Sequence, residues 1–168
     1  MKFIKGILDG VYIIEYDPIK DERGCLSRVF CEDEFKSHGL DPHISQCSIS
    51  YNKKKGTFRG MHYQSFPHEE TKIITCTKGM IFDIILDLRE NSKTYGKWET
   101  HCLSESPVYS LYIPKGCAHG FQTLVDNTIV HYAMSAPYSE KHYYRILYKN
   151  FGIKLPLLIT NISEKDNE

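Results

Sequence analysis

The sequence predicts an all-β protein. From about residue 44 to residue 134, short runs rich in Ile, Thr, Tyr and Phe alternate with turn residues, a pattern typical of a β-sandwich or barrel. The chain also contains 12 Tyr and 8 Phe, which strands favour. Its 168 residues suit one domain with a substantial core. We therefore expect a single domain over residues 1–168.

The first third of the chain predicts two strands and a helix. Residues 10–16 are β-branched and aromatic, and Asp17-Pro18 ends this first strand. The turn 21–24 leads into a second, short strand. Residues 32–39 begin with acidic side chains, contain a later Lys and stop at a Gly, the order that a short helix prefers. We expect this helix to be the only one before the C-terminal region.

Eight further strands follow, each bounded by turn residues. They are expected near residues 44–51, 58–63, 71–77, 80–87, 97–103, 108–113, 119–125 and 128–134. Beyond residue 138 the pattern weakens, and residues 142–149 are compatible with either a helix or a strand.

Composition argues against several classes of partner and location. The 21 Lys and Arg residues balance 21 Asp and Glu residues, so no nucleic acid or membrane partner is expected. No apolar run approaches the roughly 20 residues of a membrane span, and the N-terminus lacks a signal-peptide apolar region. We expect a cytoplasmic protein. Its six cysteines contain no CxxC pair, which favours free thiols over a zinc site or a redox pair.

Two segments each combine a histidine with a strand edge. Residues 57–64 contain Arg59 and His62, and residues 113–121 contain His119 just after a Pro/Gly turn. Strict alternation would place Arg59 on the opposite face from His62. We expect the two histidines to line one pocket, although His62 could instead be a hydrogen-bonded core histidine.

These two segments resemble the paired motifs of the cupin superfamily, which implies a double-stranded β-helix, or jelly roll, with short peripheral helices. Metal-binding cupins carry His-x-His in the first motif, so that alternate residues meet one ion. Here the second histidine is Gln64, which leaves only His62, a Glu and His119. We therefore expect no metal, and the resemblance described next implies no cofactor of any kind.

A wider set of motifs resembles one branch of that superfamily, the dTDP-4-dehydrorhamnose 3,5-epimerase family. The similarity runs from about residue 9 to residue 166. Its motifs are Asp21-Glu22-Arg23-Gly24, Arg59-Gly60-Met61-His62-Tyr63-Gln64, Ile81-Phe82-Asp83 through Asp87-Leu88-Arg89, Ser92-Lys93-Thr94-Tyr95-Gly96-Lys97-Trp98, Ile113-Pro114-Lys115-Gly116-Cys117-Ala118-His119-Gly120-Phe121 and Ile162-Ser163-Glu164-Lys165-Asp166.

The resemblance implies an isomerase that inverts C3, C5 or both on a nucleotide-linked 4-keto-6-deoxy sugar. The ketone acidifies the neighbouring C–H groups, so the reaction needs a base, a cation or donor at the ketone oxygen, and an acid on the opposite face. The family pattern makes His62 the base, Asp166 its partner, Lys72 the cation and Tyr132 the acid.

The same resemblance assigns substrate contacts and a quaternary state. The implied contacts are Arg23, Gln46, Arg59, Asp83, His119 and Lys165. Arg23 and Lys165 would bind phosphate, Arg23 in a neighbouring subunit's site, so we expect a homodimer. Such sugars feed surface polysaccharides, which suggests by analogy a role in lipopolysaccharide or O-antigen synthesis.

The chain departs from the family where the nucleotide base is held. Cys25 replaces an aromatic residue, Arg28 an acidic one and Pro137 one of a tyrosine pair. Outside this group, Tyr143 stands in place of a Glu in an altered region on the substrate side. Either the nucleotide differs from dTDP or its base is held differently. Two other functions stay open at this point: a cupin that moves the ketone between C4 and C3, and a non-catalytic or metal-binding sugar cupin.

Overall fold

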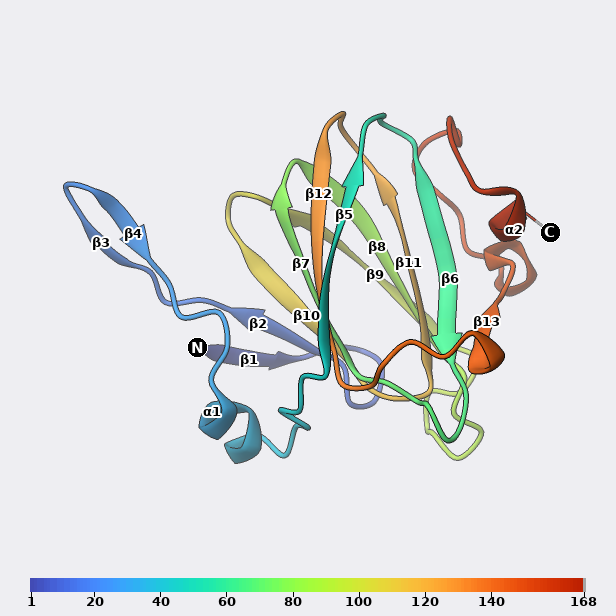
Figure 1. Cartoon of the computed structure of the whole chain (residues 1–168), viewed down its shortest axis with the longest axis horizontal. Helices are drawn as coiled ribbons and strands as arrows, with labels where there is room; N and C mark the ends of the chain where they lie inside the picture. The colour runs from blue at the N-terminus through green and yellow to red at the C-terminus, as the bar shows by residue number, and fades with distance from the viewer. Residues whose placement is uncertain (168) are drawn as a thin grey trace.

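Two antiparallel sheets form the body of the computed structural model, which describes residues 1–167 (Figure 1). The six-stranded sheet contains, in spatial order, β1 (Lys2–Lys5), β2 (Tyr12–Glu15), β10 (Tyr109–Ile113), β7 (Lys72–Lys78), β12 (Thr128–Met134) and β5 (Gln46–Asn52). The five-stranded sheet contains β13 (Tyr143–Arg145), β6 (Phe58–Gln64), β11 (Cys117–Thr123), β8 (Met80–Asp87) and β9 (Trp98–Ser104). The expected all-β jelly roll is confirmed.

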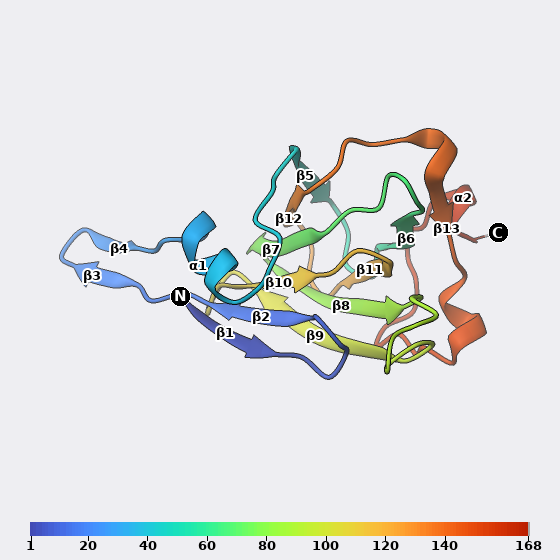
Figure 2. The same cartoon turned by 90° about the horizontal axis from the view of Figure 1, so that it is seen from below.

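Short elements lie outside the two sheets. The hairpin of β3 (Ile19–Asp21) and β4 (Gly24–Leu26) projects away from the body (Figure 2). Helix α1 (Glu32–Ser37) is the only helix found before residue 140 among the described residues. Helix α2 (Glu164–Asn167) ends the described chain, and two 3₁₀ turns (Glu140–His142 and Tyr148–Phe151) flank β13.

Most elements agree with the sequence prediction. All eight strands expected after residue 44 form, with bounds that differ by no more than two residues. The helix ends at Ser37 rather than at residue 39. Residues 142–149, for which the sequence allowed either a helix or a strand, contain strand β13 and part of the second 3₁₀ turn. Strands β1 and β3 were not expected from the sequence; both are short, and each forms by pairing with a neighbouring strand.

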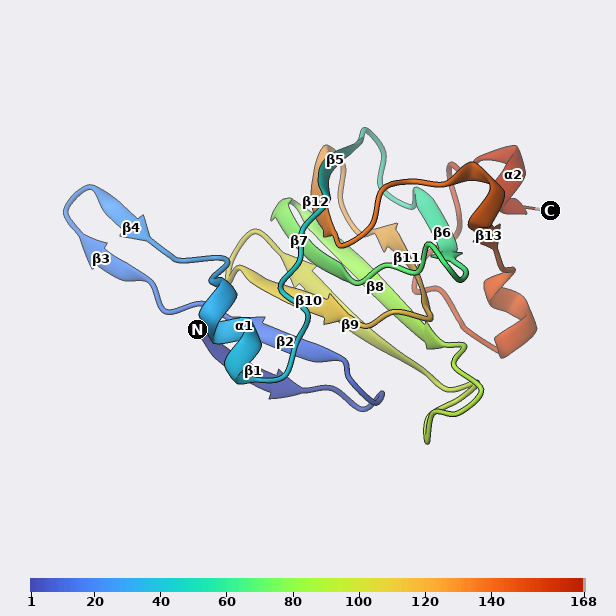
Figure 3. The same cartoon turned by 60° about the horizontal axis from the view of Figure 1, so that its bottom comes forward.

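The core lies between the sheets and continues on both outer faces. The inner cluster includes Ile74, Ile85, Leu111 and Phe121, each at most 1% exposed. Outside the six-stranded sheet, helix α1 covers the surface near β2 (Figure 3) by inserting the fully buried Phe35. Burying such a ring contributes about 1.5–3 kcal/mol, which explains how a six-residue helix without a side-chain N-cap persists.

The C-terminal segment covers the outer face of the five-stranded sheet. Ile153 packs with Phe58, Met61 and Leu86 in a third apolar cluster. A parallel bridge joins Thr57 to Asn161. These contacts return the end of the chain to β6 and thereby position helix α2 behind that strand.

Candidate active site

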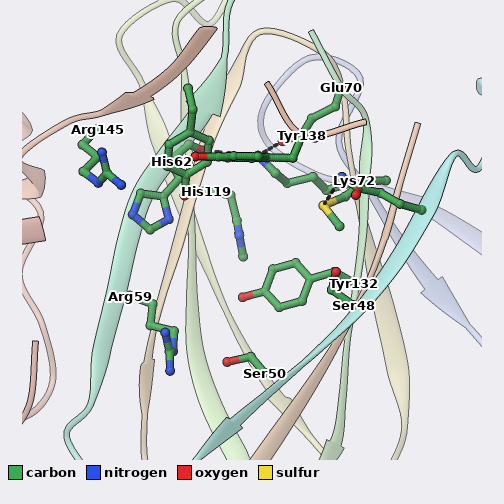
Figure 4. Close-up of a pocket in the computed structure, with 13 residues that line it drawn as sticks. Ser48, Ser50, Arg59, His62, Glu70, Lys72, His119, Tyr132, Tyr138 and Arg145 are labelled. Carbon is green, nitrogen blue, oxygen red and sulfur yellow. Dashed lines mark hydrogen bonds and ion pairs between the residues drawn. The ribbon is translucent and has the colours of Figure 1, made fainter. Parts of the chain in front are cut away.

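A cleft of about 450 Å³ opens between the two sheets. Its walls come from β5, β7 and β12 on one side and from β6 and β11 on the other, with residues 138–145 at the rim (Figure 4). Six residues proposed from the sequence line it: Gln46, Arg59, His62, Lys72, His119 and Tyr132. The sheet topology therefore gathers candidates that lie up to 86 positions apart in the sequence.

The expected alternation of Arg59 and His62 was wrong, because a β-bulge interrupts β6. His62 pairs with His119 and Arg59 with Phe121, so Gly60 and Met61 oppose the single residue Gly120. A bulge adds one residue and resets which side chains share a face. Arg59 and His62 consequently line the same wall.

Glycine is required at this bulge. Gly60 has φ of +128°, and a Cβ there would lie 2.4 Å from the Cα of Gly120. Such a backbone conformation is accessible to glycine and costly for other residues. Gly60 therefore brings the guanidinium of Arg59 and the imidazole of His62 to one cleft.

His62 is backed by a carboxylate from the end of the chain. Its Nε2 lies 2.7 Å from Oδ1 of Asp166 in helix α2, and the Asp166 side chain is 7% exposed. Burial by itself raises the pKa of Asp166, but the hydrogen bond and charge of His62, with the Gly60 amide, hold it below its ordinary value. An ionised carboxylate here fixes the ring orientation and stabilises the imidazolium that forms when His62 accepts a proton.

A second histidine–aspartate pair lies deeper in the protein. Nε2 of His119 lies 2.7 Å from Oδ2 of Asp83, and both side chains are at most 4% exposed. Oδ1 of Asp83 has no hydrogen-bond partner within residues 1–167. The His119 ring packs edge-on against Tyr132, with ring centres 5.9 Å apart, so Asp83 acts on the cleft through His119 rather than lining it.

Tyr132 enters the cleft from β12, on the wall opposite β6 (Figure 4). Burial raises the pKa of its phenol well above the ordinary value. The Asp83 carboxylate raises this pKa further, while the Arg59 cation lowers it by a smaller amount. The phenol is thus fully protonated at neutral pH, which suits a proton donor.

The cations of the cleft are held by defined partners. Nζ of Lys72 lies 3.1 Å from Oε1 of Glu70 and donates to the backbone carbonyl of His62 at 3.3 Å. Nε of Arg59 donates to Oδ1 of Asn52 at 2.8 Å. Gln46 donates to the carbonyl of Ala136 at 3.1 Å, which ties β5 to the rim segment.

Besides Asp83, two further expected substrate contacts lie outside the cleft of this chain. Arg23 is on the projecting hairpin, where its 89% exposed side chain pairs with Asp21 at 2.6 Å. Lys165 borders a smaller cavity behind Asp166, with Arg145 and Asn150. Cys25 and Arg28, read as departures from the family, also lie in or beside the hairpin, and neither lines the cleft.

Sequence reasoning missed several residues that line the cleft. These are Ser48, Ser50, Met134, Tyr138 and Arg145. Glu70 was noted only as part of the first motif, and Tyr143 only as a departure from the family. Arg145 pairs in register with His62, and its Nε lies 3.4 Å from Oδ1 of Asp166. Ser48 and Ser50 could have been found, because they alternate with Gln46 along β5 and so share its face. The short strand β13 gave no comparable periodic signal.

Two features are absent from the described residues. Within residues 1–167, no group of three or more His, Cys, Asp or Glu side chains is arranged to hold a metal ion. No helix in the same range is long and apolar enough to cross a membrane.

Fold and site together define a class of protein. A jelly roll whose cleft holds a histidine–aspartate pair, a buried lysine and a protonated phenol is built for proton transfer at carbon, which is the chemistry of an epimerase of cupin fold. The family model described as dTDP-4-dehydrorhamnose 3,5-epimerase matches residues 5–168. The chain belongs to the dTDP-4-dehydrorhamnose 3,5-epimerase family and is an isomerase.

Individual relatives agree with this assignment. The dTDP-4-dehydrorhamnose 3,5-epimerase of Methanothermobacter thermautotrophicus is 38% identical over 170 residues, which cover 98% of this chain and 91% of the relative. The crystal structure of the Bacillus anthracis enzyme with TDP and PPi bound is 34% identical with a TM-score of 0.94, covering 98% and 95% of the two chains. The Legionella pneumophila enzyme in complex with dTDP-4-keto-L-rhamnose is 30% identical with a TM-score of 0.92, covering 99% and 89%.

Proposed function

We propose that this enzyme epimerises a nucleoside diphosphate-linked 4-keto-6-deoxy sugar at C3, C5 or both, with His62 as the base and Tyr132 as the acid. The observation that carries the proposal is that these two side chains enter one cleft from opposite sheets. Inversion requires a proton to leave from one face of the sugar ring and another to arrive at the other face. A base and an acid on facing walls meet that requirement.

His62 removes the proton next to the ketone, and Asp166 stabilises the imidazolium that results. The electron pair of the broken C–H bond delocalises onto the C4 oxygen as an enolate. The Lys72 ammonium stabilises this oxygen, and His119, held by Asp83, contacts the substrate beside it. Preorganised charges of this kind act where negative charge develops. Tyr132 then donates its phenolic proton to the opposite face of the carbon.

The diphosphate is expected at the cationic groups of the assembled enzyme. Arg59 lies in the cleft, and its planar guanidinium suits phosphate oxygens. Gln46 adds a polar contact on the opposite wall. Arg23 would bind from a neighbouring subunit, and Lys165 would act from the surface behind Asp166.

A homodimer is part of this proposal. The hairpin β3–β4 extends away from the body, and its paired apolar residues Ile19 and Leu26 are each 74% exposed. Docking the hairpin on a second copy would bury these side chains and bring Arg23 to that copy's cleft. Sedimentation equilibrium tests the dimer, and mixing Arg23→Ala with His62→Ala subunits tests the shared site. Recovery of turnover in the mixture is expected; mixed dimers without recovery would contradict the shared site.

The identity of the nucleotide is tested separately. A dTDP sugar is the first choice, because the relatives carry that name. Cys25, Arg28 and Pro137 depart from the family at the base-holding positions, so binding of dTDP, GDP, CDP and UDP should be compared by calorimetry. A preference for dTDP would mean that other side chains hold the thymine.

A cytoplasmic location fits six cysteines that are all free thiols.

The reaction is tested by NMR with dTDP-4-keto-6-deoxyglucose in heavy water. Deuterium is expected at each inverted centre, C3 or C5, together with the epimerised product. A ketoisomerase would instead produce a 3-keto sugar. Absence of both exchange and binding for every nucleotide sugar would contradict the proposed function.

A further inference from the structure

The cleft contains a buried ion pair between Lys72 and Glu70. The proposed mechanism gives a role to Lys72 but none to Glu70. Nζ of Lys72 and Oε1 of Glu70 lie 3.1 Å apart, and the two side chains are 7% and 5% exposed. Both line the cleft. Lys72 is the first residue of β7 and Glu70 lies two positions before it, a spacing at which side chains of an extended chain share a side.

Glu70 is fixed independently of Lys72. Nε2 of Gln64 donates to its other oxygen, Oε2, at 3.2 Å. The same Nε2 shares its two hydrogens with the backbone carbonyls of His68 at 2.9 Å and Pro137 at 3.2 Å. The Gln64 side-chain carbonyl accepts from the backbone amide of Ser139 at 2.7 Å. One carboxylate oxygen is thereby anchored to β6 and the rim, which leaves the other oxygen aimed at the ammonium.

Glu70 is the one opposite charge beside Lys72 among the residues that line the cleft. Among the residues that the structure shows lining the cleft, Arg59 and Arg145 are further cations and Glu70 is the only carboxylate. A buried ammonium loses charge through desolvation and through like charges nearby, and it keeps its charge when an opposite charge lies within about 4–6 Å. Neutral lysine could not stabilise an enolate electrostatically.

The titratable or charged groups that face Lys72 are Glu70 beside it, Arg59 and His62 on β6, His119 and Cys117 on β11, Tyr132 on β12, and Tyr138, Tyr143 and Arg145 at the rim.

We propose that Glu70 is a positioning residue for epimerisation, which holds Lys72 as an ammonium ion aimed into the cleft. This inference rests on the role of Lys72 in the proposed function. Glu70 need not touch the substrate, because it acts through the charge and direction of Lys72.

The decisive variant is Glu70→Gln, which keeps the shape and the hydrogen-bonding oxygen but removes the charge. The matched control is Glu69→Gln, the same change at the next residue, which does not line the cleft. Turnover is measured from neutral to alkaline pH. We expect Glu70→Gln to lower kcat about tenfold or more with little change in KM, as expected when a charged hydrogen-bond partner is lost.

The pH profile separates a charge effect from a structural one. The alkaline half-point of kcat should be lower in Glu70→Gln than in Glu69→Gln, because the opposite charge beside Lys72 is lost. Acylation of Lys72 by an amine-reactive reagent, followed by mass spectrometry, should become faster at neutral pH because the neutral amine reacts. Glu70→Asp keeps the charge and should retain the wild-type half-point, so this variant tests the same idea if Glu70→Gln folds poorly.

The double variant Glu70→Gln with Lys72→Met tests whether Glu70 acts through Lys72. If the double variant has nearly the same kcat as Lys72→Met alone, the inference is supported. An alkaline half-point and acylation rate equal to those of Glu69→Gln would overturn it, and so would a rise in KM alone, which would make Glu70 a substrate contact. Wild-type turnover of Lys72→Met would instead contradict the proposed role of Lys72, so the two failures are distinguishable.

Discussion

Replacing Asp166 with Asn tests the base most directly. The variant keeps the size of the side chain but removes the charge that lies 2.7 Å from Nε2 of His62. A hydrogen bond to a charged group contributes about 1.5–3 kcal/mol, which corresponds to roughly 10- to 150-fold in rate. An Asn amide can also donate to His62 and select the wrong tautomer, so the loss can approach the 10⁴-fold described for the aspartate of serine-protease triads.

The assay is turnover of a 4-keto-6-deoxy sugar nucleotide followed by NMR in heavy water, with kcat and KM determined separately. We expect kcat to fall at least tenfold while KM changes little, because Asp166 lies behind His62 and does not line the cleft. A thermal melt checks that helix α2 still docks. Turnover within twofold of wild type, in a variant that melts normally, would refute the pairing of Asp166 with the catalytic base.

Three other substitutions test the rest of the site and the fold. Tyr132→Phe should abolish inversion, but deuterium should still enter the substrate, because His62 can remove and return a proton on the same face of the sugar ring. Loss of deuterium exchange as well would argue against Tyr132 as the acid. Gly60→Ala should destabilise the protein by on the order of 3 kcal/mol in urea unfolding, since the new Cβ would meet the Cα of Gly120 at 2.4 Å; an unchanged midpoint would mean that the bulge relaxes freely. Burial by itself would raise the pKa of Asp87, but hydrogen bonds from Arg89, Ser92 and Thr94 hold it well below its ordinary value. Its carboxylate therefore stabilises the fold above the ordinary aspartate pKa, and this contribution is lost as pH falls toward the lowered value. Asp87→Asn should cost about 3 kcal/mol at neutral pH, as for breaking a buried ion pair, and less in acid; a penalty that does not change with pH would contradict this reading.

The sequence predicted the strands well because their signal is local. A β-branched and aromatic run between turn residues is sufficient to identify β7 or β8, whatever surrounds it. Strands β1 and β3 have only four and three residues, and they form through pairing with a neighbour, which no single short segment reveals. Helix α1 was predicted from its charges, although Phe35 packing against the sheet is what holds it.

The site was predicted less evenly, because its geometry depends on long-range contacts. The similarity of motifs identified His62, Lys72 and Tyr132, and the structure brings them to one cleft. Strict alternation failed at Gly60, since a bulge depends on how β6 meets β11. Arg145 was missed because its relation to His62 exists only through pairing across the sheet. Glu70 did leave a signal, as a carboxylate two residues from a lysine at a strand end.

The two histidine–aspartate pairs differ in what holds each of them in place. His119 and Asp83 are almost fully buried and lie between adjacent strands β11 and β8, so their arrangement is part of the core. His62 is 22% exposed and depends on a carboxylate 104 residues away, carried by a four-residue helix. Both histidines therefore lie on sheet strands, but the carboxylate partner of His62 comes from the C-terminal segment, whereas that of His119 comes from a neighbouring strand. We infer that docking of the C-terminal segment, rather than folding of the jelly roll itself, completes the catalytic base.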